Sequence, residues 1–440
     1  MSTQRGPDAP ESKRYRWYAL GVLVLVFTSS HVDRQIMGIL LEPIKQELGA
    51  SDTQMGFLVG ITFAIFYATL GVPIAMLADR FNRRNIIVWA ITMWSAMTAL
   101  CGYAQTFAQL ALARIGVGVG EAGSNPPSHS MISDMFPVHE RATAMAIFAS
   151  GINLGLLIAY LGGGWMSEHW GWRATFFAVG LPGLLIAMLV RLTLAEPARG
   201  GAEAPGRPDS TRDAPALAVV ARTMMRTRSV RHIVVGASLA VFVGYGMVLW
   251  LPAFFVRSHG LSQTQVGLTL ALLSGVVGAI GTLASGRIAD LLARRDLRWT
   301  PWVVALAKIA TVPFSIWFFA TTDFRQALLI YLVPAFFGGF YLGPGFAMVQ
   351  SLMPLRMRAV AAAISLFVGN LVGLGLGPQG VGLLSDLLAP RFGIESLRYA
   401  LMAFACLNLW AALHYWLASH TLAEDLARAG ATTDVIRQPA

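Results

Sequence analysis

Charged residues inside long apolar runs are the features of this sequence that could carry chemistry. The glycine-rich run at 111–127 holds one cation, Arg114, and one anion, Glu121, about two helical turns apart. On a helix both side chains would share one face, roughly 10 Å from each other. A second pair, Asp33 and Arg34, lies within the first apolar run. If these runs cross a membrane, each of the four charges is costly to bury, and such charges usually serve binding or proton transfer.

The composition of the whole chain indicates an integral membrane protein. Of its 440 residues, 55% are hydrophobic and 13% are charged, against about 25% charged in an ordinary soluble domain. The two cysteines, Cys101 and Cys406, lie in apolar runs without the spacing of a metal site or a disulfide framework. The sequence shows no nucleophile–base pairing, metal-ligand spacing or phosphate-binding loop with a lysine. We therefore expect neither an enzyme nor a cofactor.

Twelve apolar runs are long enough to cross a membrane as helices, and we number them spans 1 to 12. They lie at about 17–41, 54–78, 86–105, 107–128, 142–165, 174–195, 231–256, 264–289, 300–320, 326–349, 358–384 and 396–419. The longest polar interval, at 196–230, divides them six and six. This pattern predicts an all-α integral membrane fold in which twelve transmembrane helices form two pseudo-symmetric six-helix bundles. The predicted parts are a tail at 1–16, a bundle at 17–195, a linker at 196–230, a bundle at 231–419 and a tail at 420–440. The second half of the linker, 216–228, fits either a basic amphipathic helix on the membrane surface or a plain linker.

The distribution of basic residues predicts the orientation. Most of the 33 lysine and arginine residues fall in one set of alternate loops, which includes both termini and the linker. By the positive-inside rule these parts are cytoplasmic, and the chain lies in the cell's inner membrane. The net charge of +10 is then a consequence of topology, and we expect no nucleic-acid partner.

The two halves of the chain repeat each other. Short motifs recur at a nearly constant offset, which indicates an internal duplication of the kind found in secondary transporters. The matched positions are Gly49, Ser51, Thr53, Gln54 and Gly56 with Gly260, Ser262, Thr264, Gln265 and Gly267, and Asp79, Arg83 and Arg84 with Asp290, Arg294 and Arg295.

The duplicated loop predicts a gate. A carboxylate at a helix end can pair with an arginine cluster and lock the ends of two helices. Arg141 and Arg358, which precede spans 5 and 11, are expected to pair with Asp79 and Asp290 in a closed state. The alternative is that the arginines only set the topology. The candidate gating residues are Asp79, Arg80, Arg84, Arg141, Asp290, Arg294 and Arg358.

Glycine patterns in spans 4 and 10 predict close packing and a break. The segment at 118–123 matches the dinucleotide fingerprint G-x-G-x-x-G, but no strand precedes it, so that interpretation is rejected. Glycines in a membrane helix instead let backbones approach closely. The run Gly343-Pro344-Gly345 predicts a kink or break in span 10.

The depth of the four charges predicts which of them meet. Asp33 lies about 24 Å along span 1, and Arg114 lies about 10 Å along span 4 from the opposite side. Asp33, Arg34 and Arg114 then have similar depth, and Glu121 lies one to two turns further toward the cytoplasm. We predict a contact between Asp33 and Arg114, with Glu121 either bonded to Arg34 or left to titrate. A static structural ion pair is the alternative to proton coupling.

Other polar and aromatic residues complete the candidate site. His31, about half a turn before Asp33, fits either a proton shuttle or a neutral hydrogen-bonded histidine. Lys308 in span 9 fits a snorkelling or paired side chain, or a contact to an anionic substrate. The possible cavity-lining residues in the second half are Tyr245, Trp250, Lys308, Phe340, Tyr341 and Asn370.

Three motifs resemble those of the major facilitator superfamily, and within it those of spinster-type transporters. They are Ser30-His31-Val-Asp33-Arg34, the loop Ala78-Asp79-Arg80, and the segment at 113–122 that carries Arg114 and Glu121. The loop departs from the superfamily signature G-x-x-x-D-R-x-G-R-R/K at Ala75 and Asn82, and its second copy lacks the arginine after Asp290. The resemblance implies transport of lysolipids or sphingolipids, with proton coupling in some members. It also implies that Asp33, Arg34, Arg114 and Glu121 form the polar substrate and coupling site.

We therefore expect a proton-coupled secondary transporter that works by alternating access on an amphipathic, lysolipid- or sphingolipid-like substrate. Its other partner would be the lipid bilayer, and the working form would be a monomer. One alternative is a transporter of a small organic anion, such as a sugar acid, bound by Arg34, Arg114 and Lys308. A second alternative is a membrane receptor or scaffold without transport, which the duplicated gate argues against.

Overall fold

The computed structural model describes residues 12–199 and 216–437. Residues 1–11 and 438–440 of the predicted tails, and 200–215 of the predicted linker, lie outside the described residues. All regular structure in the described part is helical and consists of eighteen α-helices, two π-helical segments and two 3₁₀ turns. The chain divides into two compact units, one of Met1–Leu48 and Thr62–Pro208, the other of Gly49–Ile61 and Asp209–Ala440. We call them unit 1 and unit 2.

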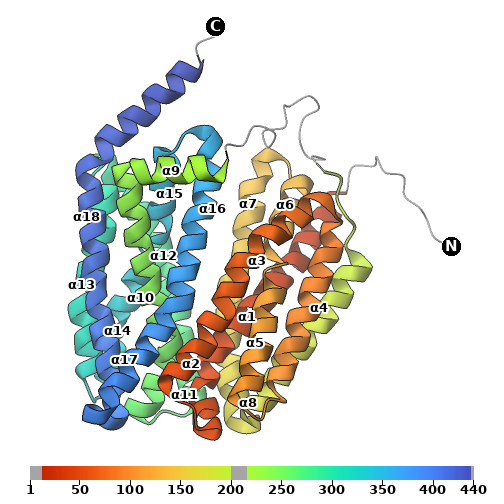
Figure 1. Ribbon diagram of the computed structural model, residues 1–440, viewed down its shortest axis with the longest axis vertical. Helices are drawn as coiled ribbons and strands as arrows, with labels where there is room; N and C mark the ends of the chain where they lie inside the picture. The colour runs from red at the N-terminus through yellow and green to blue at the C-terminus, as the bar shows by residue number, and fades with distance from the viewer. Residues whose placement is uncertain (1–11, 200–215, 438–440) are drawn as a thin grey trace, which may run out of the picture. The chain divides into compact units, whose positions relative to one another are not determined.

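Unit 1 is a helical bundle in which α1 packs on α8, and α4 packs on both α8 and α5 (red to yellow in Figure 1). The long helix α8 contains one non-helical residue, Gly171, with φ of 77°. Glycine adopts this conformation readily, so Gly171 is the turn between the fifth and sixth spans. The helices are α1 (Lys13–Leu48), α3 (Ile61–Arg80), α4 (Arg83–Cys101), α5 (Phe107–Glu121), α6 (Asn125–Met135), α7 (Val138–Ala149) and α8 (Gly151–Thr193).

Unit 2 is a second bundle, in which α10 and α13 pack on α18, and α2 packs on α17 (Figure 1). Two of its spans contain π-helical segments, η1 (Ala271–Val277) and η3 (Asn370–Leu376), which often occur near functional sites. Short 3₁₀ turns lie at Leu355–Met357 and Gly393–Glu395. The α-helices are α2 (Asp52–Val59), α9 (Leu217–Arg226), α10 (Arg228–His259), α11 (Gln263–Leu270), α12 (Gly278–Ala293), α13 (Trp299–Ala320), α14 (Phe324–Gly338), α15 (Leu342–Leu352), α16 (Arg358–Gly369), α17 (Gly377–Phe392) and α18 (Ser396–Arg437).

The predicted duplication has a local structural cause at the start of α2 and α11. Ser51 caps α2 and Gln54 bonds back to its backbone, and Ser262 and Gln265 form the same capping box at α11. The glycines before the two caps, Gly49 and Gly260, have φ of 61° and 63°. The repeated sequence motif therefore encodes the same turn and the same helix N-terminus in each half of the chain.

The linker contains the amphipathic helix and not a plain loop. Helix α9 buries Val220 and Met224 in the core of unit 2, while Arg222 and Arg226 are exposed. Of the two predicted alternatives for 216–228, the helix is therefore the one present, and its place on the membrane surface stays a prediction.

The predicted break in span 10 is displaced. The helix is interrupted between α14 and α15, at 339–341, and Gly343-Pro344-Gly345 lies inside α15. A Cβ atom on Gly339 would lie 2.1 Å from Oγ1 of Thr282, so the close approach of α12 requires glycine there. The prediction placed the break too late because it relied on Gly and Pro alone.

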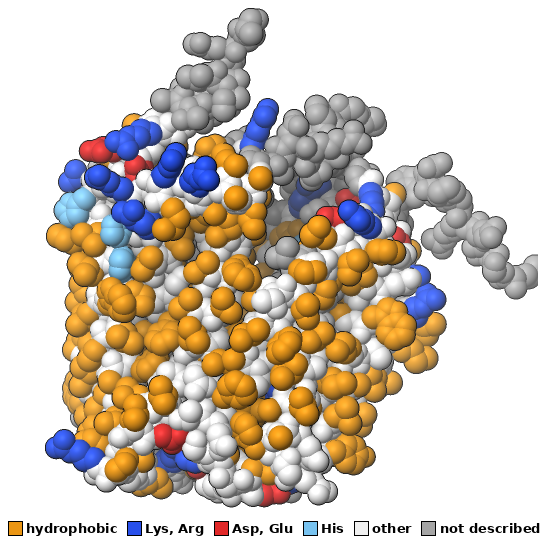
Figure 2. All heavy atoms as spheres, in the orientation of Figure 1, with side chains coloured by type: hydrophobic (Ala, Val, Ile, Leu, Met, Phe, Trp, Pro, Cys, Tyr) orange, Lys and Arg blue, Asp and Glu red, His pale blue; other side chains and the backbone are white. Residues whose placement is uncertain are grey.

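The surface of the helices suits a lipid environment. Seven helical stretches of the described chain are long and apolar enough to cross a membrane, and two of these, His139–Thr193 and Val360–Ala429, have 55 and 70 residues. Each of these two has enough residues for two crossings of about 20 residues. On the face shown in Figure 2, hydrophobic side chains cover the middle of unit 2, and lysine and arginine gather toward its upper end.

Candidate substrate and proton site

The four predicted charges meet in two ion pairs inside unit 1. Nη1 of Arg114 lies 3.3 Å from Oδ1 of Asp33, and Nε of Arg34 lies 2.6 Å from Oε2 of Glu121. Helix α1 supplies one member of each pair and α5 supplies the other. The Asp33, Arg114 and Glu121 side chains are at most 2% exposed, and that of Arg34 is 14% exposed. The predicted Asp33–Arg114 contact is therefore present, and of the two alternatives for Glu121 the bond to Arg34 is the one observed, with both pairs almost completely buried.

Glycines of α5 let neighbouring helices close around these charges. A Cβ atom on Gly118 would lie 2.8 Å from the carbonyl oxygen of Phe63 in α3. A Cβ atom on Gly120 would lie 2.7 Å from the backbone nitrogen of Trp94 in α4. This close approach explains the glycine-rich pattern of 111–127 as helix packing.

Side chains that the sequence analysis missed complete the surroundings of the pairs. Thr98 of α4 donates a short hydrogen bond to Oδ2 of Asp33. The Arg34 guanidinium lies 4.9 Å from the ring centroid of Phe63 and 4.3 Å from that of Tyr67, within cation–π range. Aromatic residues in an apolar run carry no sequence signal that separates such contacts from ordinary packing.

The carboxylate of Glu121 is only half satisfied. Its Oε2 accepts the bond from Arg34, whereas Oε1 is buried without a hydrogen-bond partner among the described residues. Buried polar atoms in native proteins are normally paired, so an exception calls for an explanation. The free oxygen can accept a proton, which would neutralise the carboxylate that bonds to Arg34.

His31 is placed apart from this chemistry. Its Nδ1 lies 2.9 Å from the carbonyl oxygen of Phe27, and its ring packs against the Phe27 ring at 4.5 Å between centroids. Since a carbonyl oxygen only accepts, Nδ1 carries the hydrogen. This geometry fits the hydrogen-bonded histidine among the two predicted roles, and proton shuttling by His31 stays a prediction.

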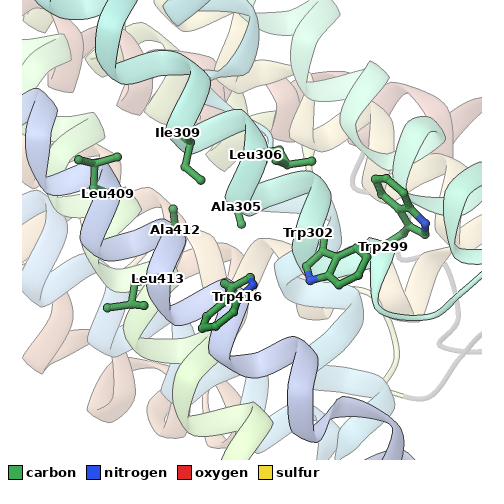
Figure 3. Close-up of a pocket in the computed structure, with 9 residues that line it drawn as sticks. All are labelled: Trp299, Trp302, Ala305, Leu306, Ile309, Leu409, Ala412, Leu413 and Trp416. Atoms are coloured by element: carbon green, nitrogen blue, oxygen red, sulfur yellow. The ribbon is translucent and has the colours of Figure 1, made fainter.

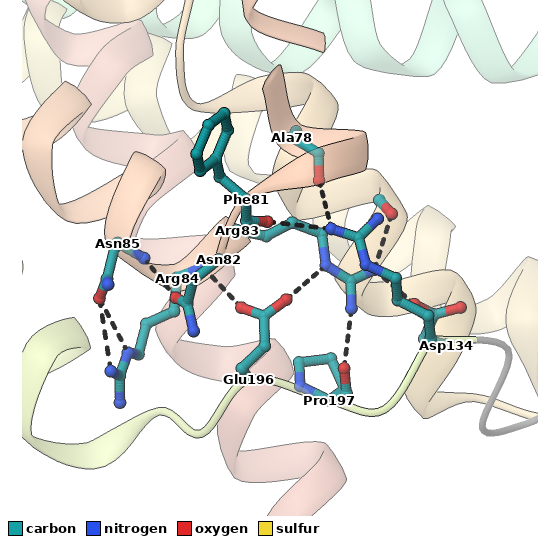
Figure 4. A network of polar contacts seen from close by, with 11 residues as sticks. Ala78, Phe81, Asn82, Arg83, Arg84, Asn85, Asp134, Glu196 and Pro197 are labelled. Carbon is teal, nitrogen blue, oxygen red and sulfur yellow. Dashed lines mark hydrogen bonds and ion pairs between the residues drawn. The ribbon is translucent and has the colours of Figure 1, made fainter. Parts of the chain in front are cut away.

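A buried arginine organises one end of unit 1 (Figure 4). The Arg83 side chain is 1% exposed and bonds to Asp134 of α6 and, at 2.7 Å, to Oε1 of Glu196. It also donates to Ser130 Oγ and to the Pro197 carbonyl oxygen, both at 2.8 Å. Arg83 therefore ties the loop before α4 to α6 and to the segment after α8.

The predicted gating residues are arranged differently from the expected pairs. Nη2 of Arg141 donates to the Ser133 carbonyl oxygen at 2.7 Å, and Nε of Arg358 donates to that of Met353 at 3.1 Å. Neither Asp79 nor Asp290, both exposed, forms an ion pair within the described ranges.

Of the remaining predicted gate residues, Arg80 and Arg294 are exposed, and Nη1 of Arg84 donates to the Leu194 carbonyl oxygen at 3.2 Å. Gating by these residues stays a prediction. Arg83, the first residue of α4, was not in the predicted set, although it makes more polar contacts than the predicted residues around it.

The predicted cavity residues of unit 2 are either buried or partly buried. Trp250 and Phe340 are packing residues, 0% and 2% exposed. Lys308 is 3% exposed, and its Nζ lies 3.1 Å from the Gly338 carbonyl oxygen, at the break between α14 and α15. It also lies 4.9 Å from the ring centroid of Tyr341. The partly buried residues are Tyr245, Tyr341 and Asn370.

A second polar cluster, absent from the sequence predictions, fastens α2 within unit 2. Nη1 and Nη2 of Arg257 bond to the two carboxylate oxygens of Asp52, each at 2.8 Å, and Ser385 Oγ donates to Asp52 Oδ2 at 2.6 Å. Asp386 accepts the backbone N–H groups of Asp52 and Thr53 at 3.1 and 2.7 Å. We call these five residues the α2 clamp.

Hydrogen bonds favour the charged form of the Asp386 carboxyl group of the clamp. Asp386 lies beyond the predicted span, and partial burial alone would raise the pKa of its carboxyl group. Hydrogen bonds from Thr53, Ser51 and the backbone of Asp52 outweigh burial and lower this pKa below its usual value. The sequence gives only a weak signal of the clamp, an acidic residue before span 2 and a basic residue after span 7.

Comparisons with known proteins agree with this architecture. The family model of the Major Facilitator Superfamily matches residues 23–378. An MFS-type efflux pump of Mycolicibacterium smegmatis is 36% identical over 420 residues, covering 94% of this chain and 95% of the relative. A probable L-galactonate transporter of Escherichia coli is 26% identical over 418 residues, covering 92% and 89%.

A solved structure is similar over nearly its whole length. It is described as a bacterial homologue of the human lysosomal transporter Spinster, in an inward-facing and unoccupied conformation. The TM-score is 0.86 at 31% sequence identity, and the match covers 94% of this chain and 99% of that chain.

Two duplicated bundles of membrane-crossing helices, with ion pairs buried between spans, define the class of a secondary-transporter fold. The chain belongs to the Major Facilitator Superfamily of membrane transporters. Within the superfamily it is a bacterial member of the spinster type. The family and the fold class predicted from the sequence are thereby confirmed, and the chain is an integral membrane protein.

Proposed function

We propose that this chain is a proton-coupled secondary transporter that works by alternating access, with the two buried ion pairs of unit 1 as its substrate and coupling site. The observation that carries the proposal is the half-satisfied carboxylate of Glu121, whose Oε1 is buried and unpartnered beside the Arg34 bond. Ionised side chains within a membrane are rare, and those in transporters commonly relay protons or bind substrate.

Coupling follows from the charge balance of the site. With both carboxylates ionised, the two pairs are neutral in sum. A proton on Oε1 of Glu121 removes the negative charge of the carboxylate that pairs with Arg34 and leaves the four-residue site with a net positive charge. Arg34 then favours an anionic substrate group, to which guanidinium groups bind through charge-assisted hydrogen bonds. Loss of the proton restores the ion pair and weakens the hold on that group.

An amphipathic substrate suits the surroundings of Arg34. Its guanidinium stacks near Phe63 and Tyr67, so a charged contact and an aromatic surface lie next to each other. A lysolipid offers both an anionic phosphate and an acyl chain. The resemblance of the motifs around these charges to those of spinster-type transporters, which implies lysolipids or sphingolipids, favours this class of substrate.

The α2 clamp and the contacts of Arg83 are polar clusters at span ends that would have to break during alternating access. Residues Gly49–Ile61 belong to unit 2, although the chain on both sides belongs to unit 1. When one unit moves against the other, this segment is pulled by the unit 1 chain on both sides of it, and the α2 clamp would keep it attached to unit 2. In unit 1, Arg83 would play the corresponding part together with the predicted gate. We further propose an inner-membrane monomer with cytoplasmic termini, from the distribution of arginine.

A small organic anion is the second candidate substrate. The relative named as a probable L-galactonate transporter favours it, as does Lys308, whose buried Nζ lies against a carbonyl oxygen and the Tyr341 ring. A sugar acid would bind through arginine and lysine without any need for an apolar surface.

Uptake by proteoliposomes separates these candidates. Labelled lysophosphatidylglycerol is offered with and without an imposed pH gradient, and D-galactonate is added as a competitor. The exposed Arg391→Gln variant in unit 2 serves as a control. The proposal predicts gradient-stimulated uptake that D-galactonate does not reduce. Strong competition by D-galactonate would favour the second candidate, and absence of lysophosphatidylglycerol uptake would overturn the proposed substrate.

A further inference from the structure

An apolar groove lies on the outside of unit 2 between α13 and α18 (Figure 3). Its volume is about 440 Å³, within the range of sites that hold small molecules. All its lining residues are apolar or tryptophan: Trp299, Trp302, Ala305, Leu306, Ile309, Leu409, Ala412, Leu413 and Trp416.

The groove is produced by small residues between large ones. Its floor contains Ala305 and Ala412, which are 4% and 2% exposed. Its walls include Leu306 and Leu413, which are 54% and 48% exposed. Two alanines that face each other from adjacent helices thus leave a channel between rows of protruding side chains.

The length of the groove matches one leaflet of a bilayer. Trp299 and Ile309 mark its ends along α13, and the helix between them rises about 15 Å. The hydrocarbon core of a bilayer is about 30 Å thick. The groove can therefore hold one acyl chain of one leaflet along its length.

Tryptophan side chains mark the end that meets the polar interface. Trp302 and Trp416 lie at the same end of the groove (Figure 3). Nε1 of Trp302 donates to Ser419 Oγ at 2.9 Å, and the Trp416 ring contacts that of the exposed His420. Indole groups of membrane proteins gather at the level of the lipid headgroups. This end of the groove therefore opens where a headgroup lies.

Basic residues lie in the loop that leads into α13 beside Trp299. Arg294, Arg295 and Arg298 directly precede Trp299 in sequence, and all three are exposed. Asp296 is the one acidic residue in this loop, and its Oδ1 accepts the backbone N–H of Arg298 at 2.8 Å. The loop thus presents net positive charge, which attracts anionic headgroups.

We infer that this groove is a binding site for an anionic phospholipid of the surrounding bilayer, with an acyl chain between α13 and α18 and the phosphate at Arg295 and Arg298. The lipid is resident and is not the transported substrate, and the inference does not rest on the proposed function. A narrow concave channel that ends at a basic loop fits a chain with an anionic head better than the flat face of a second copy.

Native mass spectrometry of the detergent-purified full chain tests this inference. Phosphatidylglycerol and phosphatidylcholine with identical acyl chains are titrated separately. Arg298→Gln removes one headgroup contact, and Ala412→Leu fills the floor of the groove. The controls are Arg391→Gln, an exposed arginine outside this loop, and Ala403→Leu, an exposed alanine of α18 outside the groove.

The inference predicts that the wild type retains phosphatidylglycerol in preference to phosphatidylcholine. Arg298→Gln should weaken phosphatidylglycerol binding about fivefold and leave phosphatidylcholine binding unchanged. Ala412→Leu should weaken both, and the controls neither. Equal binding of the two lipids by the wild type, or Ala412→Leu binding that equals wild type, would overturn it. So would a dimer that Ala412→Leu dissociates, because a second copy would then cover the groove.

Discussion

Nε of Arg34 lies 2.6 Å from Oε2 of Glu121, while Oε1 of the same carboxylate has no hydrogen-bond partner in the described part of the chain. One carboxylate thus has one oxygen committed to an arginine and one oxygen open to a proton. The neighbouring pair differs, because Asp33 bonds to Arg114 through Oδ1 and to Thr98 through Oδ2. This difference is the reason that we propose Glu121 for proton coupling and a mainly positioning role for the Asp33–Arg114 pair.

The positioning role predicts an effect on stability. Arg114→Gln leaves the Asp33 carboxylate buried without its counter-charge, which should lower the free energy of unfolding by about 3–5 kcal/mol. The double variant Asp33→Asn/Arg114→Gln removes both charges and should recover most of that loss. Denaturant unfolding of the detergent-solubilised protein measures both, with Arg391→Gln as the control. A double variant no more stable than Arg114→Gln would contradict the pairing.

The aromatic contact of Arg34 predicts a substrate effect that depends on the ring. Tyr67→Leu removes the ring 4.3 Å from the guanidinium and should raise the KM for lysophosphatidylglycerol about fivefold or more, since a buried cation–π contact is worth about 1–2 kcal/mol. Tyr67→Phe keeps the ring and should behave like the wild type. Uptake kinetics measure both, and equal loss in the two variants would assign the effect to the hydroxyl group.

The Arg83 network predicts where unit 1 loosens. Arg83→Gln removes the buried guanidinium that bonds to Asp134, Glu196 and Pro197. Hydrogen–deuterium exchange of 194–197 and of the start of α4 should become at least tenfold faster. The exposed Arg80→Gln should leave these rates unchanged. If the two variants exchanged alike, the network would not hold this segment.

The hydrogen bonds to Asp386 predict the pH dependence of the α2 clamp. A carboxylate whose pKa is lowered on folding stabilises the folded form above its unfolded pKa of about 3.9, and this contribution is lost as the pH falls through the lowered value. Protection of the Asp52 and Thr53 amides should therefore stay constant from pH 8 to pH 5 and fall only below about pH 4. Hydrogen exchange, corrected for intrinsic rates, measures this protection.

Two variants control the clamp experiment. A Cβ atom on Gly382 would lie 2.2 Å from the Asp52 carbonyl oxygen, whereas one on Gly286 would meet nothing within 4 Å. Gly382→Ala should therefore reduce protection at every pH, and Gly286→Ala should not. Loosening of the wild-type clamp between pH 8 and pH 5 would show that a group other than Asp386 controls it.

The sequence was sufficient for the fold because its main signals are local. Apolar runs predict the spans, and the capping boxes of Ser51 and Ser262 repeat as short motifs. Charges are so rare in these runs that Asp33, Arg34, Arg114 and Glu121 were the natural candidates. Depth predicted the Asp33–Arg114 pair and left the bond between Arg34 and Glu121 as one of two alternatives.

What the sequence could not predict depends on contacts between distant segments. Asp52 and Arg257 are separated by most of a repeat, and neither is unusual at a span end. Arg83 differs from the adjacent Arg84 in that its side chain is buried, where it pairs with Asp134 and Glu196. The sequence around the two arginines does not show this difference. The break in span 10 lies at Gly339, where Thr282 of another helix comes too close for a side chain. Such pairings arise from tertiary packing and leave no periodic signal.

Proton movement driven by substrate tests the role of Glu121 most directly. Proteoliposomes with a trapped pH-sensitive dye receive lysophosphatidylglycerol on the outside, and the internal pH is followed for wild type, Glu121→Gln and Arg391→Gln. We predict a substrate-dependent pH change in wild type and in Arg391→Gln. Glu121→Gln should show none, while it still exchanges labelled for unlabelled substrate across the membrane. A substrate-driven pH change of wild-type size in Glu121→Gln would contradict the account.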